Sequence, residues 1–425
     1  MLLPAGAVLQ SYMAGNWYSI LHSYSLGIFF GTAAWILFLA ALVLSCRIRF
    51  LDRLFGQDRL IQTHKHFASA AVVSAFFHAF FKMQFSSRIT IQHATGFLGY
   101  SVIILLAFFS ALVMSRFLFT EFLSIEPLKR KARSLFRYSA MKFLHNGLPA
   151  ALVIILIHIL IASSTAEIAI RSVLILITGI PVLLLWLFHK IARPLFSPRG
   201  EIAQISTHSD HLFSVTLRFA NPFKYVPGQF AYFRVSAPGL KEEHPFTLSG
   251  AEHSDITLLI KKEGRWTNAL CSAAAGTPVR MDGFYGKFTF TSRKPMLWIA
   301  GGVGITPFLA KIRSMREADS VFPFPVRLIW TAAGRQEMPF ADVFESHAVR
   351  DEMFEFIPVR TRDEDSAGRL SAERIRGEIE SLGNLSNLQP SVWFCGSFSL
   401  RGTVLKGVKM AGLSGKCFHY EEFSV

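Results

Sequence analysis

The chain has 425 residues, 51% of them hydrophobic, and its 44 Lys and Arg against 29 Asp and Glu give a formal charge of +15. At about 100–200 residues per domain, this length allows two or three domains. The composition excludes a disordered tail protein and a small disulfide-stabilised domain.

The positive charge is concentrated in the first half of the chain. Residues 1–196 carry 17 Lys and Arg against 5 Asp and Glu, whereas residues 197–425 carry 27 against 24. The cations of the first half alternate with long apolar runs and do not form one solvated face, as a nucleic-acid surface would require. The sequence therefore predicts no nucleic-acid partner.

Five apolar runs in the first half contain no Asp, Glu, Lys or Arg. They span residues 26–45, 67–81, 94–115, 147–166 and 172–188. Each comes near the ~17–25 residues that a helix needs to cross a bilayer. The alternative, buried helices of a soluble core, would need five such runs within 200 residues. We therefore predict an all-α membrane domain with lipid as its partner.

The cations between the runs predict the orientation of this domain. Segments 47–65, 116–142 and 190–193 hold 14 of its 17 Lys and Arg. Because positive loops face the cytoplasm, the N-terminus is expected outside and everything after residue 196 in the cytoplasm. This is the topology of a multi-pass protein of a plasma or inner membrane. Residues 1–25 lack charge and a signal-peptide n-region, and we interpret them as part of a further helix.

Four histidines lie in or beside these runs. His64 and His78 share one predicted helix, and His145 and His158 share another, with spacings of 14 and 13 residues. Each spacing corresponds to roughly 20 Å along a helix. The orientation puts His64 and His145 near the cytoplasmic side and the other two near the outer side. A single membrane histidine is usually satisfied by a neighbouring helix, but two at each depth favour two stacked bis-histidine haems.

Helical rotation adds two expectations. At ~100° per residue, a residue 14 positions further along a helix lies within ~40° of the starting face, whereas one 13 positions further lies ~140° away from it. The second helix must therefore be distorted, and Gly147 and Pro149 are residues that kink a helix. His66 is an alternative to His64, but its offset from His78 turns it ~120° away.

The second half changes to short alternating strands, such as 212–219 and 230–235, with Pro227-Gly228 as a turn. This pattern predicts a small antiparallel barrel. From about residue 295 the order is strand, Gly-rich turn and helix, which predicts an α/β layer with a parallel sheet. The expected domains are a transmembrane bundle over 1–196, a β-barrel over 197–292 and a Rossmann-like α/β domain over 293–425.

Three motifs in the second half point to nucleotide chemistry. A Gly-rich turn follows the strand 296–300 and precedes a helix expected near Phe308, so its backbone can approach a pyrophosphate at a helix N-terminus. Its candidate binding residues are Gly301, Gly302, Gly304, Thr306 and Pro307.

The other two motifs lie at strand ends. The segment His244-Pro245-Phe246-Thr247-Leu248-Ser249 offers a ring, an aromatic and two hydroxyls to a flavin, or is simply a strand after a proline turn. Cys395-Gly396-Ser397 follows an apolar strand, at the edge where α/β sheets bind ligands. The alternative for Cys395 is a buried structural thiol.

With these motifs in this order, the sequence resembles the NADPH oxidase and ferric reductase superfamily, from about residue 26 to residue 425. The resemblance implies that His64 and His145 ligate an inner haem, and His78 and His158 an outer haem. It also implies an FAD site and a nicotinamide site with Thr247, Cys395 and Phe423 at the reacting centre. The implied cofactor contacts are His244, Pro245, Phe246, Thr247 and Ser249, the loop residues Gly264, Trp266 and Thr267, the Gly-rich turn, and Cys395 with Gly396.

The resemblance implies electron transfer from NAD(P)H through FAD and two b-type haems to an acceptor outside. Dioxygen and a ferric chelate both remain possible acceptors. Alternatively, the chain is a haem-relay subunit that serves electrons to a periplasmic partner, although no obligate protein partner is evident. A further alternative keeps the reductase but makes the membrane half a haem-free anchor. Arg335, after the strand 326–331, favours NADPH over NADH, with Arg360, Arg362 and Arg369 as alternatives.

Three features depart from the family pattern. The family usually has six spanning helices, against five runs here, and the chain continues two residues beyond Phe423. The sequence has no calcium-binding loop of the D-x-D-x-D-G type, so calcium control is not expected.

Overall fold

The computed structural model describes residues 22–84, 89–114, 131, 138–166, 169–290, 293–362, 368–386 and 388–422. The chain divides into two compact units, Met1–Phe196 and Ser197–Val425, and each is described by itself. Phe423 and the expected domain boundary at residue 292 lie outside the described residues.

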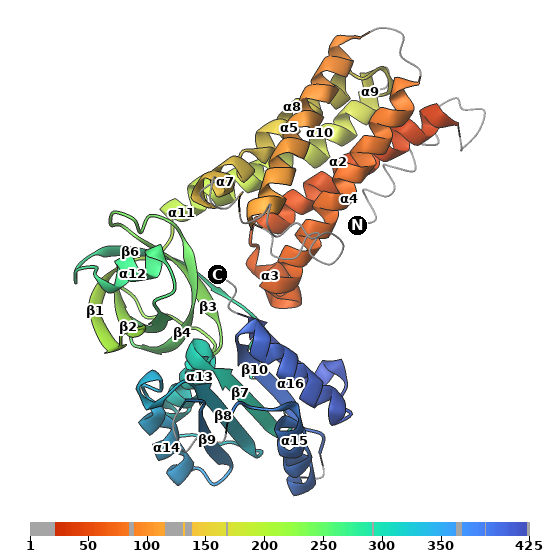
Figure 1. Cartoon of the computed structure of the whole chain (residues 1–425). Helices are drawn as coiled ribbons and strands as arrows, with labels where there is room; N and C mark the ends of the chain where they lie inside the picture. Colours follow the sequence, from red (N-terminus) through yellow and green to blue (C-terminus); the bar gives the residue numbers. More distant parts are fainter. Residues whose placement is uncertain are drawn as a thin grey trace. The chain divides into compact units, whose positions relative to one another are not determined.

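The first unit is helical throughout its described residues (Figure 1). Helix α2 packs along α4, and α5 packs against α7 and α8. The helices are α2 (Ser23–Ser45), α3 (Arg49–Phe55), α4 (Gln57–Met83), α5 (Ile91–Met114), α7 (Tyr138–His145), α8 (Leu148–Ile161), α9 (Ser163–Ala166), α10 (Ala169–Leu187), the π-helical turn η1 (Phe188–Ala192) and α11 (Arg193–Leu195).

Four helical segments in the described part of the chain are long and apolar enough to cross a membrane, one fewer than the five expected. They are Ser23–Ser45, Ile91–Ser110, Ala140–Ile161 and Ala169–Leu195. The fifth expected run, 67–81, lies within α4, which has 27 residues but also contains His64, His78 and Lys82. These polar side chains lower its hydropathy, so α4 has the length of a span without the composition of the other four.

The expected distortion near Gly147 is present. Helix α7 ends at His145 and α8 begins at Leu148, with Pro149 in its first turn. A proline there is tolerated because the first N–H groups of a helix have no partner within the helix. Gly147 N–H donates to Leu144 O at 2.9 Å, which closes a tight turn between the two helices.

The second unit begins with a closed antiparallel barrel, as expected. Its strand order is β1-β2-β5-β4-β3-β6, and inward side chains such as Phe213, Phe233 and Leu248 form its core. The strands are β1 (Arg199–Ser209), β2 (Leu212–Phe219), β3 (Phe230–Val235), β4 (His244–Glu252), β5 (Asp255–Lys261) and β6 (Pro278–Tyr285), with helix α12 (Arg265–Cys271) between β5 and β6.

A five-stranded sheet follows, in the order β11-β10-β7-β8-β9, and all of its pairings are parallel. Its strands are β7 (Met296–Gly301), β8 (Val326–Ala332), β9 (Phe354–Arg360), β10 (Ser391–Gly396) and β11 (Phe418–Glu422). The helices are α13 (Thr306–Glu317), α14 (Ala341–Arg350), α15 (Ala372–Ser386) and α16 (Phe398–Met410), with 3-10 turns η2 (Gly302–Ile305), η3 (Arg335–Glu337) and η4 (Gly415–Cys417).

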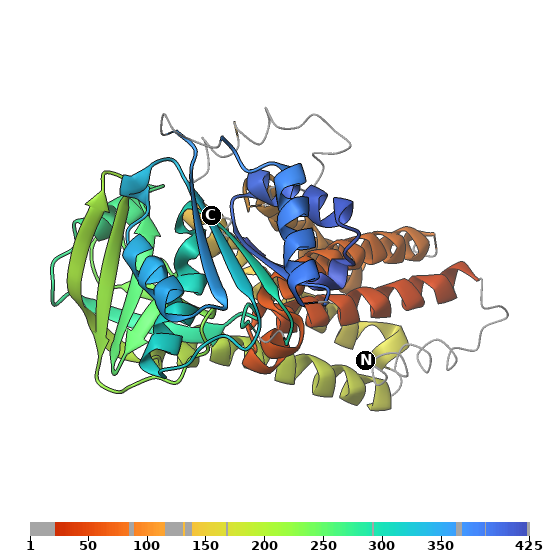
Figure 2. The ribbon, with the colours of Figure 1, turned by 90° about the horizontal axis from the view of Figure 1, so that it is seen from below.

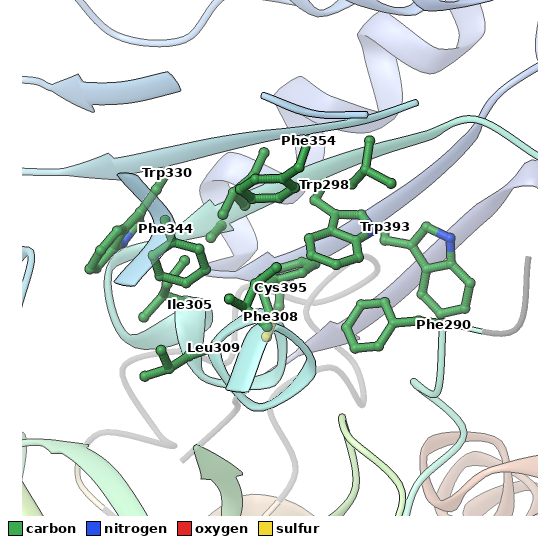
Figure 3. Close-up of a cluster of buried hydrophobic side chains, with 14 of the residues drawn as sticks. Phe290, Trp298, Ile305, Phe308, Leu309, Trp330, Phe344, Phe354, Trp393 and Cys395 are labelled. Carbon is green, nitrogen blue, oxygen red and sulfur yellow. The ribbon is translucent and has the colours of Figure 1, made fainter. Parts of the chain in front are cut away.

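Helices cover both faces of this sheet (Figure 2). The side chains of successive β7 residues lie on opposite faces of the sheet: Trp298 packs with Phe308 of α13, whereas Ile299 packs with Ile375 of α15. Figure 3 shows the first of these clusters, in which Cys395 lies beside Ile305 and Phe308. Strands buried on both faces explain the nearly continuous apolar runs in this part of the sequence.

Candidate functional site

The barrel brings two sequence motifs together at β4 and α12. The Trp266 ring lies 4.3 Å from that of His244 and 5.6 Å from that of Phe246, centroid to centroid, and is stacked on Phe246 with an interplanar angle of 27°. These residues are about 20 positions apart in the sequence. The barrel therefore builds one aromatic wall from two motifs that the sequence separates.

In the same two motifs, two polar atoms are buried without a hydrogen-bond partner among the described residues. They are Thr247 Oγ1 and Trp266 Nε1, on side chains that are 3% and 8% exposed. A buried donor left without a partner costs roughly 1–3 kcal/mol. Such groups are rare in native proteins unless a ligand or water satisfies them. Each of these two atoms is therefore a candidate partner for a polar group of a ligand.

The other expected flavin contacts fall into two groups. Pro245 is exposed at the start of β4, whereas Ser249 is fully buried and donates its hydroxyl to Thr257 O at 2.8 Å, which holds β4 on β5. The Thr267 hydroxyl accepts from Gly264 N at 3.1 Å and so caps α12. A Cβ at Gly264 would meet nothing within 4 Å, so this loop leaves open space beside it.

The glycines of the Gly-rich turn serve two different purposes. A Cβ at Gly304 would lie 2.1 Å from Cys395 O, and one at Gly396 would lie 3.1 Å from Gly301 N. These glycines therefore let η2 pack directly against the end of β10. Gly302 is different, because its φ is +53° and a Cβ there would meet nothing. The turn thus has room for a ligand at Gly302 and none at Gly304.

The end of the turn and the end of β10 form one edge of the sheet. Thr306 is buried and donates its hydroxyl to Val303 O at 2.6 Å, and Pro307 is buried in the first turn of α13. Cys395 is fully buried, and burial, aided by the Glu421 carboxylate, raises the pKa of its thiol well above the usual range. Cys395 therefore presents a neutral thiol.

Glu421 is a site residue that the sequence analysis missed. It pairs with Cys395 in the parallel register of β10 and β11. A Cβ at Gly286 would lie 3.1 Å from the Phe230 ring and 3.4 Å from Glu421 Oε1, and Phe230 pairs with Thr247. The edge that carries Cys395 therefore comes close to Gly286 and to Phe230 of β3, the strand that neighbours β4 with Thr247. Only the placement of β11 reveals this, because in the segment 420–423 the sequence suggested a role for Phe423 alone.

Arg335 lies in η3, directly after β8, and is exposed. Thr361 N–H donates to Ala332 O, and Arg362 N–H donates to Ala333 O at 3.0 Å, which brings the segment after β9 alongside the segment after β8. The structure thus gathers Arg335 and Arg362 at the same sheet edge. This leaves both open as partners for a 2′-phosphate.

In the first unit, the four histidines form two pairs. The ring centroids of His64 and His145 lie 6.2 Å apart, and those of His78 and His158 lie 6.0 Å apart. His66, the alternative, is exposed on α4. The pairing expected from the sequence is present. In a continuous helix a 13-residue spacing would turn His145 and His158 to different faces, but the break between α7 and α8 lets each of them face its partner on α4.

A hydrogen bond to Nδ1 orients each of these rings. His64, His78 and His158 contact the backbone oxygens of Ala41, Gly27 and Gln92 at 2.7–2.8 Å, and His145 contacts Ser110 Oγ at 3.1 Å. A carbonyl oxygen only accepts, so Nδ1 of the first three rings carries the proton. Nε2 of each of these rings then has a free lone pair for a metal.

Glycines make room for the His78–His158 pair. A Cβ at Gly31 would lie 2.5 Å from His78 Nδ1, and one at Gly96 would lie 2.8 Å from His158 Cε1. The neighbouring helices α2 and α5 can therefore approach the imidazoles closely. Small residues at such positions are typical of helix packing in membranes.

Comparison with known proteins bears on the second unit. Residues 198–292 match a family model described as an FAD-binding domain. A flavohemoglobin from Malassezia yamatoensis has a TM-score of 0.50 with this chain at 14% sequence identity, and the comparison covers 100% of this chain and 99% of the other. At that identity the likeness concerns the fold alone.

Two relatives come from the family that the motifs resemble. Human dual oxidase 1 is 33% identical over 146 residues, which is 30% of this chain and 9% of the relative. Ferric reduction oxidase 5 of Arabidopsis thaliana is 28% identical over 116 residues, which is 25% of this chain and 16% of the relative. The chain thus spans less than a fifth of either relative. The chain therefore contains an FAD-binding domain, and parts of it are similar to a dual oxidase and to a ferric reduction oxidase.

Proposed function

We propose that the chain carries electrons across a membrane, from NAD(P)H in the cytoplasm to an acceptor outside, through FAD and two bis-histidine haems. The observation that carries this proposal is the presence of two histidine pairs in the helical unit of a chain whose other unit contains an FAD-binding domain. A flavin accepts two electrons as hydride and releases them singly, and haems carry single electrons.

The histidine pairs fit haem iron in distance and in tautomer. A metal held at about 2 Å from one nitrogen of each ring places the ring centroids roughly 6 Å apart. The observed separations are 6.2 and 6.0 Å. Nδ1 of three of the rings is held by a backbone oxygen, which leaves Nε2 for the metal.

In the reductase unit, this chain's own residues prepare a dry site. The aromatic wall of His244, Phe246 and Trp266 excludes water from one side. The Thr247 hydroxyl is available to the polar edge of the flavin ring. Cys395, held neutral, adds no charge where the nicotinamide ring would lie. The open side of Gly302 and the N-terminus of α13 suit the pyrophosphate of NAD(P)H.

Sidedness follows from the cation distribution. The segments that hold most Lys and Arg of the first unit include 190–193, next to the first residue of the reductase unit. By the positive-inside rule, this distribution supports a cytoplasmic reductase unit, with the His78–His158 pair near the outer side.

We propose dioxygen as the acceptor, with superoxide as the product, and a ferric chelate as the second candidate. The similarity to dual oxidase 1 is higher than that to ferric reduction oxidase 5, at 33% against 28% identity. The preferred nucleotide is NADPH, because Arg335 and Arg362 can meet a 2′-phosphate.

The test uses the full chain, purified in detergent and supplied with FAD. We expect a pyridine haemochrome assay to give two b-type haems per FAD, and NADPH to support cytochrome c reduction that superoxide dismutase abolishes. Reduction of a ferric chelate that the dismutase leaves unchanged would select the second candidate. Well-folded protein without haem would contradict the relay and leave the membrane half as an anchor.

A further inference from the structure

Arg313 of α13 reaches from the nucleotide-binding sheet layer to the barrel. Its Nη1 donates to Ser249 O of β4 at 3.2 Å. Gly250 makes room for this contact, because a Cβ there would lie 3.0 Å from Arg313 Cδ and 3.1 Å from Arg313 Nη1. The guanidinium therefore lies directly on the backbone of β4.

A second contact continues from Arg313 to β1. The guanidinium carbon lies 4.8 Å from the centroid of the Phe340 ring, and that ring lies 5.1 Å from the ring of His208. Phe340 has a φ of +71°, a backbone conformation that a non-glycine residue keeps only where its surroundings hold it. Arg313 and His208 are two of its neighbours, beside the hydrophobic cluster on which it packs.

The charge of Arg313 is compensated within the same contact. Burial lowers its pKa, while Tyr225 and the carboxylates of Asp342 and Glu317 act in the opposite direction. Burial and Glu317 together raise the pKa of Tyr225 to about 12, so the phenol stays neutral. Arg313 is thus a half-buried cation with charge partners and a hydrogen bond across the junction of barrel and sheet.

The position of this contact relates it to the reaction. Arg313 is seven residues after Thr306, where α13 leaves the Gly-rich turn, and seven steps of ~100° return to nearly the same face of a helix. Ser249 is two residues after Thr247 on β4. The contact therefore ties the helix that begins at the nucleotide turn to the strand that carries the candidate flavin residue.

We propose that Arg313 is a positioning residue that sets the distance between the nicotinamide ring and the flavin ring. Hydride transfer requires the reacting atoms to lie about 3–3.5 Å apart, and a displacement of 1 Å can cost about 100-fold in rate. Arg313 touches neither ring and acts through α13 and β4. The inference rests on the proposed hydride transfer from NAD(P)H to FAD.

The test is the rate of flavin reduction by NADPH, measured by stopped-flow absorbance in the full chain with FAD bound. Arg313→Met keeps the length and removes the charge and the hydrogen bond. We expect it to lower the rate at saturating NADPH about 10- to 100-fold, with the half-saturating concentration changed by less than about threefold. Arg313→Lys, which retains a donor without the planar stack, should recover part of the loss.

Arg316→Met is the matched control. Arg316 lies on the same helix and contacts Ser346 Oγ of α14 at 3.2 Å, away from the barrel. It should keep the parent rate within about twofold.

A milder variant covers the case in which Arg313→Met does not fold. Gly250→Ala retains the arginine at position 313 but shifts its side chain by a few tenths of an ångström. We expect a rate of flavin reduction about 3- to 10-fold lower than that of the parent, a full primary isotope effect with 4-deuterated NADPH, and unchanged FAD content.

Rates within twofold of the parent in both Gly250→Ala and Arg313→Lys would overturn the proposal, as would a fall in melting temperature without a fall in rate. A parent chain that NADPH does not reduce would instead contradict the proposed function.

Discussion

The two units prepare their sites in opposite ways. In the helical unit, each paired histidine already has one ring nitrogen bound, three of them to backbone oxygens of neighbouring helices. In the reductase unit, Thr247 Oγ1 and Trp266 Nε1 are buried without a partner among the described residues. A metal needs a ring whose orientation and tautomer are fixed in advance, whereas a flavin brings its own hydrogen-bonding edge.

Glycine serves both units, but against different neighbours. In the helical unit, Gly31 and Gly96 make room for imidazole rings. In the reductase unit, Gly304 makes room for the backbone of Cys395. A side chain can rotate away from an added methyl group, whereas a strand in the middle of a sheet cannot. The same substitution should therefore act locally in one unit and globally in the other.

The largest effect is expected from variants that break the His78–His158 pair. His78→Ala or His158→Ala should remove about one haem's absorbance and lower reduction of the external acceptor by about 100-fold or more, while NADPH still reduces the flavin. Haem spectra and stopped-flow flavin reduction measure the two halves separately. His66→Ala, on the same helix but exposed, is the control and should retain both haems. Loss of flavin reduction in the histidine variants would count against this assignment.

The next effect concerns the sheet edge. Gly304→Ala places a methyl group against Cys395 O and should destabilise the reductase unit by about 1–3 kcal/mol and abolish rapid flavin reduction. Thermal unfolding followed by flavin fluorescence measures the loss. Gly264→Ala is the contrast, because its methyl group meets no protein atom: we expect an unchanged melting temperature and weaker FAD binding. Equal behaviour of the two variants would remove the distinction drawn between packing glycines and ligand-loop glycines.

A smaller effect is expected at Gly96. Gly96→Ala puts a methyl group against the His158 ring and should alter the spectrum or potential of one haem while the other is unchanged. Gly99→Ala, three residues along α5, meets the flexible end of Ile155 and should leave both haems as they are. Redox titration followed at the haem bands resolves the two. A change in the redox potential of both haems in Gly96→Ala would mean that helix α5 as a whole has moved.

The smallest effect is the pH dependence that Cys395 contributes. Its pKa is higher in the folded chain than in the unfolded chain, because burial disfavours the thiolate. Its stabilising contribution is therefore complete below the unfolded pKa of about 8.5 and is lost as pH rises above that value, at up to about 1.4 kcal/mol per pH unit. Between pH 8 and pH 10 the melting temperature of the parent should fall more steeply than that of Cys395→Ala. Parallel slopes would contradict a buried neutral thiol.

Local patterns in the sequence predicted most of the architecture. Apolar runs predicted the helical half, alternation with turn residues predicted the closed barrel, and a strand followed by a Gly-rich turn predicted the parallel sheet. These predictions succeeded because period, length and turn chemistry are local properties. One of the five expected spans was not confirmed, because the candidate metal-binding histidines of α4, together with Lys82, lower the hydropathy of this helix.

Other features depended on contacts between distant residues, and here the sequence was silent or incomplete. Spacing predicted the histidine pairs, yet the oxygens of Gly27, Ala41 and Gln92 that hold the rings come from helices whose sequences carry no mark of this role. Gly304 was expected to let a pyrophosphate approach, and the structure adds that it packs against the backbone of Cys395. Neither Glu421 nor Arg313 was a candidate site residue from the sequence.

The sequence by itself determined that this chain joins an apolar helical half with paired histidines to a flavin reductase, because composition, periodicity and motif order are encoded residue by residue. Only the tertiary structure decided which nitrogen of each histidine is left for a metal, which glycines pack against protein and which leave space, and how α13 is tied to β4. Those properties belong to pairs of residues tens of positions apart, and they exist only once the helices and strands have packed.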